Sequence, residues 1–304
     1  MATYHEPVLC REALSFLLTD KDGVYVDGTL GSGGHAESIC EQLSPRGRLI
    51  GFDADGDAIA EAGKRLQRFG ERVTIVEANF RLLRERLAGA KIAGLLLDLG
   101  VSSHQLDDGT RGFSFRSDDR LDMRMDRRAQ FSAWDVVNTY PEEQLAKILW
   151  EYGEEHLSRR IARSVVRARP VDTTGSLASI VERCVGGRFL TKSLARVFQA
   201  LRIEVNSELG SLREVLAAVP DVLQPGGRCV VISYHSLEDR IVKDFFRAEA
   251  AERIPSGNAL VPDTPRVPRL TLLTKKPVVA GKEEYERNPR ARSAKLRAAA
   301  RPAL

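Results

Sequence analysis

The sequence has few cysteines and no long hydrophobic run. Its 304 residues include four cysteines that are far apart and form no Cys-x-x-Cys pair, so neither a zinc knuckle nor a disulfide framework is expected. No apolar stretch approaches the roughly 20 residues of a membrane-spanning helix, so no integral membrane protein is expected. The N-terminal residues lack the basic region of a signal peptide. We therefore expect a reduced, cytoplasmic protein without membrane partners.

The composition is that of a globular protein, with 43% hydrophobic and 29% charged residues, and the length predicts about two domains. The net charge of +4 is unevenly distributed. Residues 266–304 contain eleven Lys and Arg against three Glu, a local charge of +8, which leaves −4 for the first 265 residues. Such a basic segment is typical of a polyanion-binding protein, although a solvated chain end would have the same composition.

The first hundred residues alternate short β-rich runs with helical patterns. Strands are expected at 24–27, 48–53, 73–76 and 92–97, and helices at 35–43 and 58–66. Strands that are apolar almost throughout and separated by helices predict a parallel sheet covered on both faces. The predicted fold class is therefore α/β.

The alternation stops after residue 101. A segment rich in Gly, Asp, Arg and Ser is followed by helical patterns at 142–152, 156–168, 177–184 and 194–209. The sheet pattern then returns, with a turn at 223–227, a strand at 229–233 and a last strand at 269–273. We predict a sheet domain formed by residues 1–105 and 213–304, interrupted by an all-helical domain over residues 106–212.

A glycine-rich loop joins the first predicted strand to the first helix. Glycines at such a loop allow close backbone approach to a ligand, although a merely tight turn is an alternative. Asp27 ends the strand before the loop, where a carboxylate would repel a pyrophosphate but suits a sulfonium and an ammonium. Asp53 ends the next strand and is placed to bind a ribose. Phe80 follows the third strand, where an adenine ring would lie. These features favour S-adenosylmethionine over a nicotinamide dinucleotide, the rival cofactor.

Asp98 ends the fourth predicted strand. Ligands of open α/β sheets bind at the carboxyl ends of the strands, so we expect Asp98 at the reacting methyl group. An acceptor there could bind the N–H of an exocyclic amine and favour its attack. A structural cap on the following turn is the alternative for this residue.

Nine blocks of the sequence resemble those of one family, the bacterial small-subunit rRNA cytosine-N4 methyltransferases of the RsmH or MraW type. They are HEPVL (5–9), VDGTLGSGGH (26–35), LLLDLGVSSHQLD (95–107), RGFSF (111–115), LDMRMD (121–126), YGEE (152–155), FQALRIEVNSEL (198–209), HSLEDRIVK (235–243) and NPRARSAKLR (288–297). The resemblance implies N4-methylation of cytosine 1402 in 16S rRNA. It also implies a Rossmann-like class I S-adenosylmethionine-dependent methyltransferase sheet with an inserted helical domain.

The resemblance implies a set of cofactor contacts in this chain, which are Gly33, Gly34, His35, Asp53, Phe80, Asp98 and Gln105. The sequence departs from the family in two places. Residues 191–196 read TKSLAR where the family usually has an HPATR-like stretch, and Tyr234 stands in a block usually read as SFHSLEDR. The second change keeps an aromatic ring and adds a hydroxyl group.

Five residues are predicted to contact the substrate: Arg202, Asn206, His235, Arg290 and Arg292. Arg202 and Asn206 share a helical face and could reach RNA, although an ion pair of Arg202 with Glu204 or Glu208 is equally compatible. His235 follows the late strand, and Arg290 and Arg292, with Arg297, are expected to face phosphates. The segment 111–116 could stack on bases, or form an ion-paired loop.

The sequence therefore predicts an enzyme that binds 16S rRNA or the small ribosomal subunit, with no metal and with a homodimer possible. The alternative is a non-catalytic rRNA-binding assembly factor that keeps a methyltransferase fold. That alternative would predict loss of the loop glycines or of Asp53, and both are present.

Overall fold

The computed structural model describes residues 7–102, 105, 108–254, 256–257 and 261–303. The chain forms two compact units, which we describe separately. Unit 1 comprises residues 1–100 and 211–304, and unit 2 comprises residues 101–210. The predicted domain limits, after residues 105 and 212, lie a few residues from these positions. No helix in the described part of the chain is long and apolar enough to cross a membrane.

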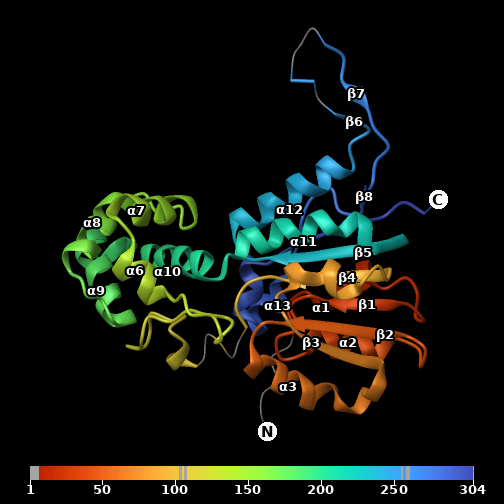
Figure 1. Cartoon of the computed structure of the whole chain (residues 1–304), viewed down its shortest axis with the longest axis horizontal. Helices are drawn as coiled ribbons and strands as arrows, with labels where there is room; N and C mark the ends of the chain where they lie inside the picture. The colour runs from red at the N-terminus through yellow and green to blue at the C-terminus, as the bar shows by residue number, and fades with distance from the viewer. Residues whose placement is uncertain (1–6, 103–104, 106–107, 255, 258–260, 304) are drawn as a thin grey trace. The chain divides into compact units, whose positions relative to one another are not determined.

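Unit 1 is built on a sheet with the strand order β3-β2-β1-β4-β5-β10-β8, with β9 paired to β10 (Figure 1). Strands β1 to β5 are parallel to their neighbours, and β10 is antiparallel to β5. The strand bounds are β1 (Val24–Asp27), β2 (Arg48–Asp53), β3 (Val73–Glu77), β4 (Ile92–Asp98), β5 (Leu223–Ser233), β8 (Thr271–Leu272), β9 (Val278–Val279) and β10 (Lys295–Ala300).

Helices cover both faces of this sheet. On β4, Ala93 and Leu96 pack with α1 and α2 in one core, whereas Leu95 and Leu97 pack with α4, α11 and α12 in the other. Successive strand residues point to opposite faces, so an apolar run such as 92–97 is expected only where both faces are covered. The helical segments of this unit are α1 (Cys10–Leu17), α2 (Gly34–Gln42), α3 (Gly56–Leu66), η1 (Gln67–Arg72), η2 (Phe80–Leu82), α4 (Leu83–Leu87), α11 (Glu208–Val222, which contains the unit boundary), α12 (Ser236–Glu249), α13 (Lys282–Arg287) and η5 (Pro289–Ser293).

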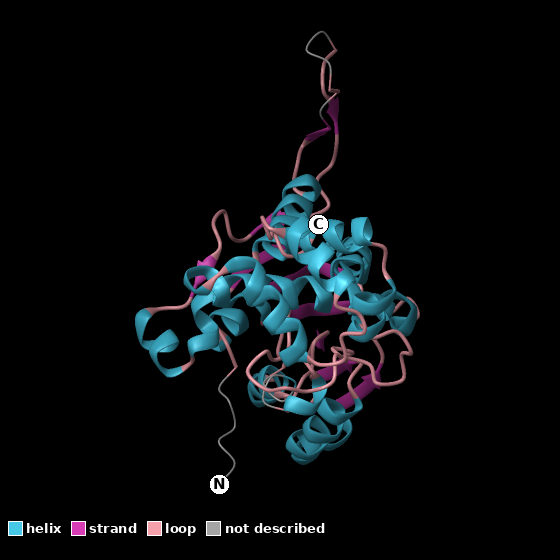
Figure 2. Ribbon diagram, turned by 90° about the vertical axis from the view of Figure 1, so that its left-hand side faces the viewer, coloured by secondary structure: helices cyan, strands magenta, loops and turns pink. Residues whose placement is uncertain are grey.

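The C-terminal part of the sheet differs from the prediction. The strand expected at 269–273 is only the short edge strand β8, and the strand beside β5 is β10, which lies in the segment predicted to be a basic tail. Leu296, Ala298 and Ala299 are buried there, so this part of the segment is core rather than a solvated end. Strands β6 (Arg253–Ile254) and β7 (Thr264–Pro265) form a small hairpin that stands away from the sheet (Figure 2).

The turn expected at 223–227 lies inside β5. Ile92 pairs with Leu223, whereas Gly94, two residues later, pairs with Arg228, and Gly226 has a positive φ of 77°. The extra residues on β5 therefore form an irregular bulge within the strand rather than a turn before it.

Unit 2 is helical and has its own core. It contains η3 (Gly109–Arg111), α6 (Ala133–Thr139), α7 (Glu142–Glu151), α8 (Ser158–Arg167), α9 (Thr174–Val185), η4 (Gly187–Phe189) and α10 (Leu190–Asn206). Leu149, Ile161, Val181 and Phe198 meet in its core. The helix predicted over 194–209 is interrupted, because Ser207 adopts a left-handed conformation (φ 48°) that ends α10 at Asn206.

Candidate active site

The glycine loop after β1 is tightly folded. Gly31 and Gly33 have φ values of 51° and 83°, which residues with a side chain rarely adopt, and Gly33 directly precedes α2. A Cβ atom at Gly28 would lie 2.5 Å from a methyl group of Leu97. The sequence therefore has glycine where the backbone must turn and where it must approach β4 closely. Helix α2 begins at this loop, so the backbone N–H groups of its first turn, which have no partner within the helix, lie beside it.

Asp53, at the end of β2, is hydrogen-bonded to the glycine loop. Its Oδ2 accepts the N–H of Gly31 at 2.8 Å, and its Oδ1 accepts the N–H of Asp55 at 2.9 Å. Each carboxylate oxygen can accept more than one hydrogen bond. Asp53 can therefore hold the loop and still accept a bond from a ligand hydroxyl.

Asp98 ends β4 and is held on several sides. Its backbone N–H donates to Thr29 Oγ1 at 2.6 Å, and the Tyr234 hydroxyl donates to its Oδ1 at 2.7 Å. Its Oδ2 lies 3.6 Å from Nδ1 of His35, and its side chain keeps 24% of its surface exposed. The carboxylate is thus fixed in place while part of it stays accessible.

Three carboxylates share this edge of the sheet with no Lys or Arg paired to them among the described residues. Asp27, Asp53 and Asp98 end β1, β2 and β4, and Asp27 interacts electrostatically with both of the others. Burial raises the pKa of Asp27 to about 6 and the pKa of Asp98 to about 7, and it also raises the pKa of Asp53. Such a group of poorly compensated carboxylates favours a positively charged ligand.

The other predicted cofactor residues of unit 1 lie around this loop. Gly34 is the first residue of α2, and Phe80 begins η2 after β3, with its Cβ close to the position that a side chain at Gly28 would take. His35 is buried, and its Nε2 lies 3.0 Å from the Val8 carbonyl oxygen. Burial lowers the pKa of His35, which favours the neutral ring.

Gln105 belongs to unit 2, so its place is described within that unit only. It is buried, its Oε1 accepts the N–H of Ser102 at 3.0 Å, and its own N–H donates to Ser102 Oγ at 3.2 Å. Its predicted contact with the cofactor stays a prediction. The neighbouring positions 103–104 and 106–107 lie outside the described residues.

Arg202 and Asn206 are engaged within unit 2. The Arg202 guanidinium donates to both carboxylate oxygens of Glu208, at 2.8 and 2.9 Å, which is the ion pair that the sequence left open. Asn206 accepts the N–H of Met125 at 2.7 Å and donates to the carbonyl of Met123 at 2.8 Å. Asn206 therefore braces the segment 123–125, and Arg202 braces the chain just after α10. The predicted RNA contact of both residues stays a prediction.

His235 and the C-terminal arginines of unit 1 have different surroundings. His235 is the N-cap of α12, and its Nε2 lies 3.1 Å from Glu238 Oε1 with only 10% of the side chain exposed. Arg290 is partly buried in η5, and Arg292 is exposed. The expectation that Arg297 faces a phosphate is wrong, because this buried side chain donates to Asp239 at 2.6 Å.

The segment 111–116 has the structural role that was its alternative. Arg111 is buried and donates to the carbonyl oxygens of Arg124 and Met125 at 2.9 and 3.2 Å. Phe113 is buried, and Phe115 packs edge-on against Phe198. Arg111 also acts electrostatically on Asp122, one of the nearby carboxylates.

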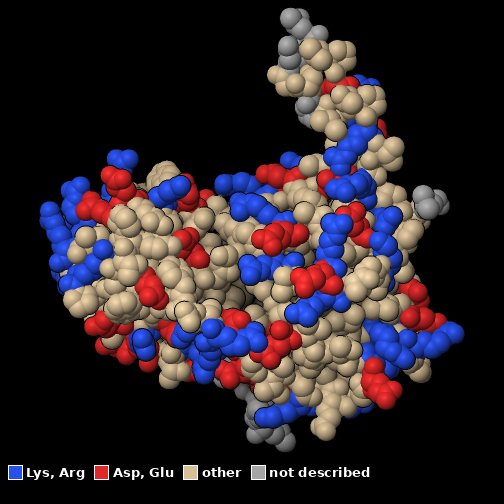
Figure 3. All heavy atoms as spheres, in the orientation of Figure 1, with Lys and Arg blue, Asp and Glu red and all other residues tan. Residues whose placement is uncertain are grey.

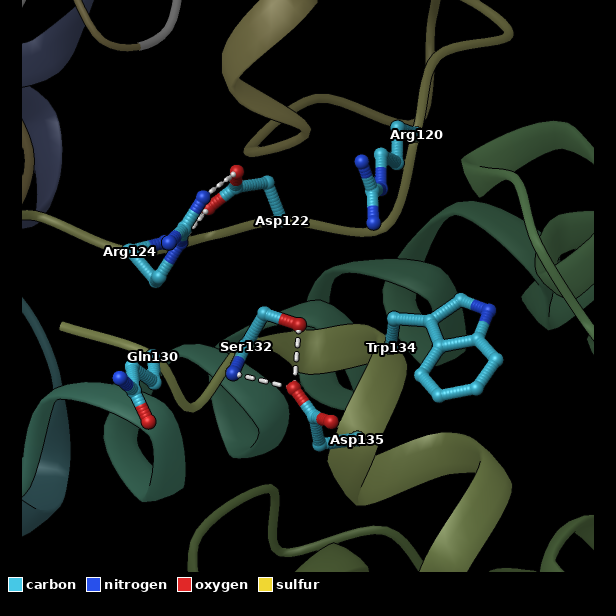
Figure 4. Close-up of a pocket in the computed structure, with 7 residues that line it drawn as sticks. All are labelled: Arg120, Asp122, Arg124, Gln130, Ser132, Trp134 and Asp135. Atoms are coloured by element: carbon cyan, nitrogen blue, oxygen red, sulfur yellow. Dashed lines mark hydrogen bonds and ion pairs between the residues drawn. The ribbon is translucent and has the colours of Figure 1, made fainter. Parts of the chain in front are cut away.

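Unit 2 also contains a polar pocket of about 220 Å³ that no predicted site residue lines (Figure 4). Figure 4 shows that charged groups at its wall bind one another, because Arg124 forms two bonds to Asp122 and Ser132 binds Asp135. The full lining is Arg120, Asp122, Arg124, Gln130, Ser132, Trp134 and Asp135.

Tyr234 is the site residue that the sequence did not assign. Its hydroxyl is the only side-chain donor recorded on Asp98 Oδ1 among the described residues. One feature of the sequence could have indicated this role. Tyr234 departs from the resembled block by adding a hydroxyl group to an aromatic ring, next to the predicted site residue His235.

Comparison with known proteins gives one consistent result. The model of the MraW methylase family matches residues 2–302. Two proteins named "Ribosomal RNA small subunit methyltransferase H" are similar over their full length. The one from Heliobacterium modesticaldum is 46% identical and covers 98% of this chain and 99% of its own, and the one from Syntrophus aciditrophicus is 48% identical and covers 98% of each.

Among solved structures, an rRNA methylase from Streptococcus thermophilus has a TM-score of 0.44 and 11% identity, with 96% of this chain and 93% of that chain covered. The family assignment rests on the sequence relatives and the family model. Over nearly its whole length the chain belongs to the MraW methylase family and is an S-adenosylmethionine-dependent methyltransferase.

Proposed function

We propose that this methyltransferase transfers a methyl group to the exocyclic N4 of a cytosine in 16S rRNA of the small ribosomal subunit. The observation that carries the proposal is the position of Asp98, an accessible carboxylate fixed at the carboxyl end of β4 beside the glycine loop. The names of the relatives support an rRNA substrate, since those proteins are named for the small-subunit rRNA.

The residues at this edge suit S-adenosylmethionine, which when bound supplies an electrophilic methyl group on a sulfonium. Its two positive charges match a site whose carboxylates lack Lys or Arg partners among the described residues. We expect Asp53 to accept a ribose hydroxyl, Phe80 to lie against the adenine, and the backbone of Gly33 and Gly34 to contact the rest of the ligand. Asp98 would lie nearest the reacting carbon.

Asp98 would act on the nucleophile. The lone pair of a cytosine amine is delocalised into the ring, so the amine is a weak nucleophile. A carboxylate that accepts an N–H bond favours the localised geometry in which the nitrogen attacks, and it stabilises the positive charge that develops there. The bound cofactor would supply the methyl group and keep the electron pair of its S–C bond on sulfur, and Asp98 or water would take the surplus amine proton. Orientation alone can supply about 7–11 kcal/mol of such a barrier.

A basic helix of unit 2 supports binding to a polyanion. Arg159, Arg160, Arg163 and Arg167 are exposed on α8 at spacings that place them on one side of the helix. Figure 3 shows Lys and Arg side chains gathered over the end of unit 2 that contains this helix. Arginines on a helix surface bind phosphates and release counterions, so this surface is suited to an RNA backbone.

Such a reaction would take place where small subunits are assembled, which is the cytoplasm. The homodimer stays a prediction, and the mass of the protein in solution would test it.

The direct test is a methylation assay with purified protein, S-adenosylmethionine carrying a labelled methyl group, and small subunits from cells that lack this modification. The rRNA is digested to nucleosides, and mass spectrometry locates the label. We expect N4-methylcytidine as the product, formed by the wild-type protein and not by the Asp98→Asn variant. A label on carbon 5 of cytosine, or on another base, would contradict the proposal.

A further inference from the structure

Tyr234 occupies a position where the resembled family block usually has phenylalanine. The additional hydroxyl group of the tyrosine forms a hydrogen bond. The residue follows β5 and is partly buried. Its hydroxyl donates to Asp98 Oδ1 at 2.7 Å across 136 positions of the chain. Its backbone N–H donates to Glu238 Oε2 at 3.0 Å. A Cβ atom at Gly100 would lie 3.4 Å from the Tyr234 ring, so the ring rests against the backbone just after β4.

The bond makes the two oxygens of Asp98 different. Oδ1 is taken by the Tyr234 hydroxyl, whereas Oδ2 faces His35 Nδ1 at 3.6 Å, a distance too long for a good hydrogen bond. The terminal torsion of an Asp side chain is soft, so a carboxylate without this partner would turn more freely. With Tyr234 in place, one oxygen is held and the other remains for a donor on a substrate.

The same bond affects the charge of Asp98. Burial raises the pKa of Asp98 to about 7, and the Tyr234 hydrogen bond acts in the opposite direction by stabilising the ionised form. Burial and the Asp98 charge raise the pKa of Tyr234 itself, so its hydroxyl remains a donor. The titratable groups of unit 1 that act on this pair from neighbouring elements are Asp27 of β1, His35 of α2, Glu238 of α12 and Arg290 of η5.

We propose that Tyr234 is a positioning residue for methyl transfer, which orients the Asp98 carboxylate and keeps it in the ionised form that accepts an N–H from the substrate amine. This inference rests on the function proposed above. It adds a specific residue to that function, because a phenylalanine at position 234 could pack equally well but could not donate.

Tyr234→Phe tests the inference, since it removes the hydroxyl and keeps the ring. Loss of the bond raises the pKa of Asp98, so a smaller fraction is ionised at neutral pH. We expect the acidic limb of the kcat–pH profile to move to higher pH by about one unit. The ionised fraction of Asp98 at pH 7 then falls from about one half to about one tenth, so kcat at pH 7 should be lower by about fivefold. The difference should shrink by pH 9, and KM for S-adenosylmethionine should change little.

Tyr25→Phe is the matched control. Tyr25 is another buried tyrosine of unit 1, and its hydroxyl donates to the Asp20 carbonyl at 2.9 Å and accepts the N–H groups of Thr19 and Asp20. Loss of the Tyr25 hydroxyl should lower the Tm and leave the kcat–pH profile unchanged. A profile for Tyr234→Phe that coincides with that of the wild type would overturn the inference and leave the proposed function standing.

A second measurement needs no activity. Carbon-13 NMR titration of the Asp side-chain carboxyl groups, with Asp98→Asn to assign the signal, reads the pKa of Asp98 directly. We expect a higher pKa in Tyr234→Phe than in the wild type, and equal values would overturn the inference. If the wild-type protein formed no N4-methylcytidine, the proposed function would fail in the product assay, and this titration would still decide whether Tyr234 controls Asp98.

Discussion

Acidic side chains at the carboxyl edge of the unit 1 sheet have no Lys or Arg partner in the described part of the chain, whereas charged side chains of unit 2 that lie close together in sequence bind each other. Asp27 and Asp98 have raised pKa values because burial is only weakly compensated. In unit 2, Arg124 lowers the pKa of Asp122, and Arg202 donates two hydrogen bonds to the carboxylate of Glu208. A motif rich in charge can therefore be structural, and the clearer sign of a functional site is charge that the protein itself leaves uncompensated.

The largest effect is expected for Asp98→Asn, which keeps the shape of the side chain and removes its charge. Loss of a preorganised acceptor at the reacting atoms should lower kcat by about 10²–10³-fold. Single-turnover methyl transfer to small subunits measures this loss. A variant that stays within a fewfold of the wild-type rate would place Asp98 outside the chemistry and remove the contrast between the two units.

Asp53→Ala should weaken S-adenosylmethionine binding by about 1–3 kcal/mol, the range for a lost hydrogen bond to a charged group. Calorimetric titration measures the affinity. Glu61→Ala, an exposed acidic residue of the neighbouring α3, is the control and should bind the cofactor as the wild type does. Equal affinity in the Asp53 variant would remove this residue from the site.

Arg202→Ala tests the other side of the comparison. We expect the free energy of unfolding to fall by about 1–3 kcal/mol, because the variant leaves the largely buried Glu208 without its partner. Denaturant unfolding measures this change, and S-adenosylmethionine affinity should be unaltered. Arg128→Ala removes an exposed pair with Asp126 and should cost only about 0–1 kcal/mol. Full stability of Arg202→Ala together with lost rRNA binding would contradict this structural role and support the substrate role predicted from the sequence.

The smallest effect concerns the pH dependence of stability. The pKa of Asp98 is raised from 3.8 to about 7 in the folded protein, so the folded state binds more protons than the unfolded state between these values. The contribution of Asp98 to stability therefore falls as the pH rises through that window. Asp98→Asn cannot ionise at this position. The Tm of the variant minus the Tm of the wild type should therefore increase by a few degrees from pH 4 to pH 8. Glu61→Gln should show no such trend, and a constant Tm difference for Asp98→Asn would contradict the raised pKa.

Much of unit 1 could be predicted from local patterns. The apolar runs located β1 to β4, and an aspartate at the end of β1, β2 and β4 located the candidate site, because parallel strands bring their carboxyl ends to one edge. The strand β10 was missed because Lys295 and Arg297 lie in a segment of high charge, although Leu296, Arg297, Ala298 and Ala299 are all buried. There the charge count concealed a buried strand.

What the sequence did not reveal involves contacts between distant parts of the chain and one helix end. The bonds of Asn206 to Met123 and Met125 span more than 80 positions, and no local pattern distinguishes them from a free amide on a helix face. Ser207 ends α10 without a glycine or a proline to signal the break. Tyr234 reaches Asp98 only because β5 and β4 are neighbours in the sheet.

The most direct measurement is a map of modified nucleosides in 16S rRNA from cells whose own gene for the corresponding methyltransferase is deleted, complemented with this chain or with its Asp98→Asn variant. The account predicts that N4-methylation of the 16S rRNA cytosine at position 1402 is absent after deletion, returns with the wild-type chain and stays absent with the variant. Methylation that persists in the deleted cells, or that the variant restores as fully as the wild type, would contradict it.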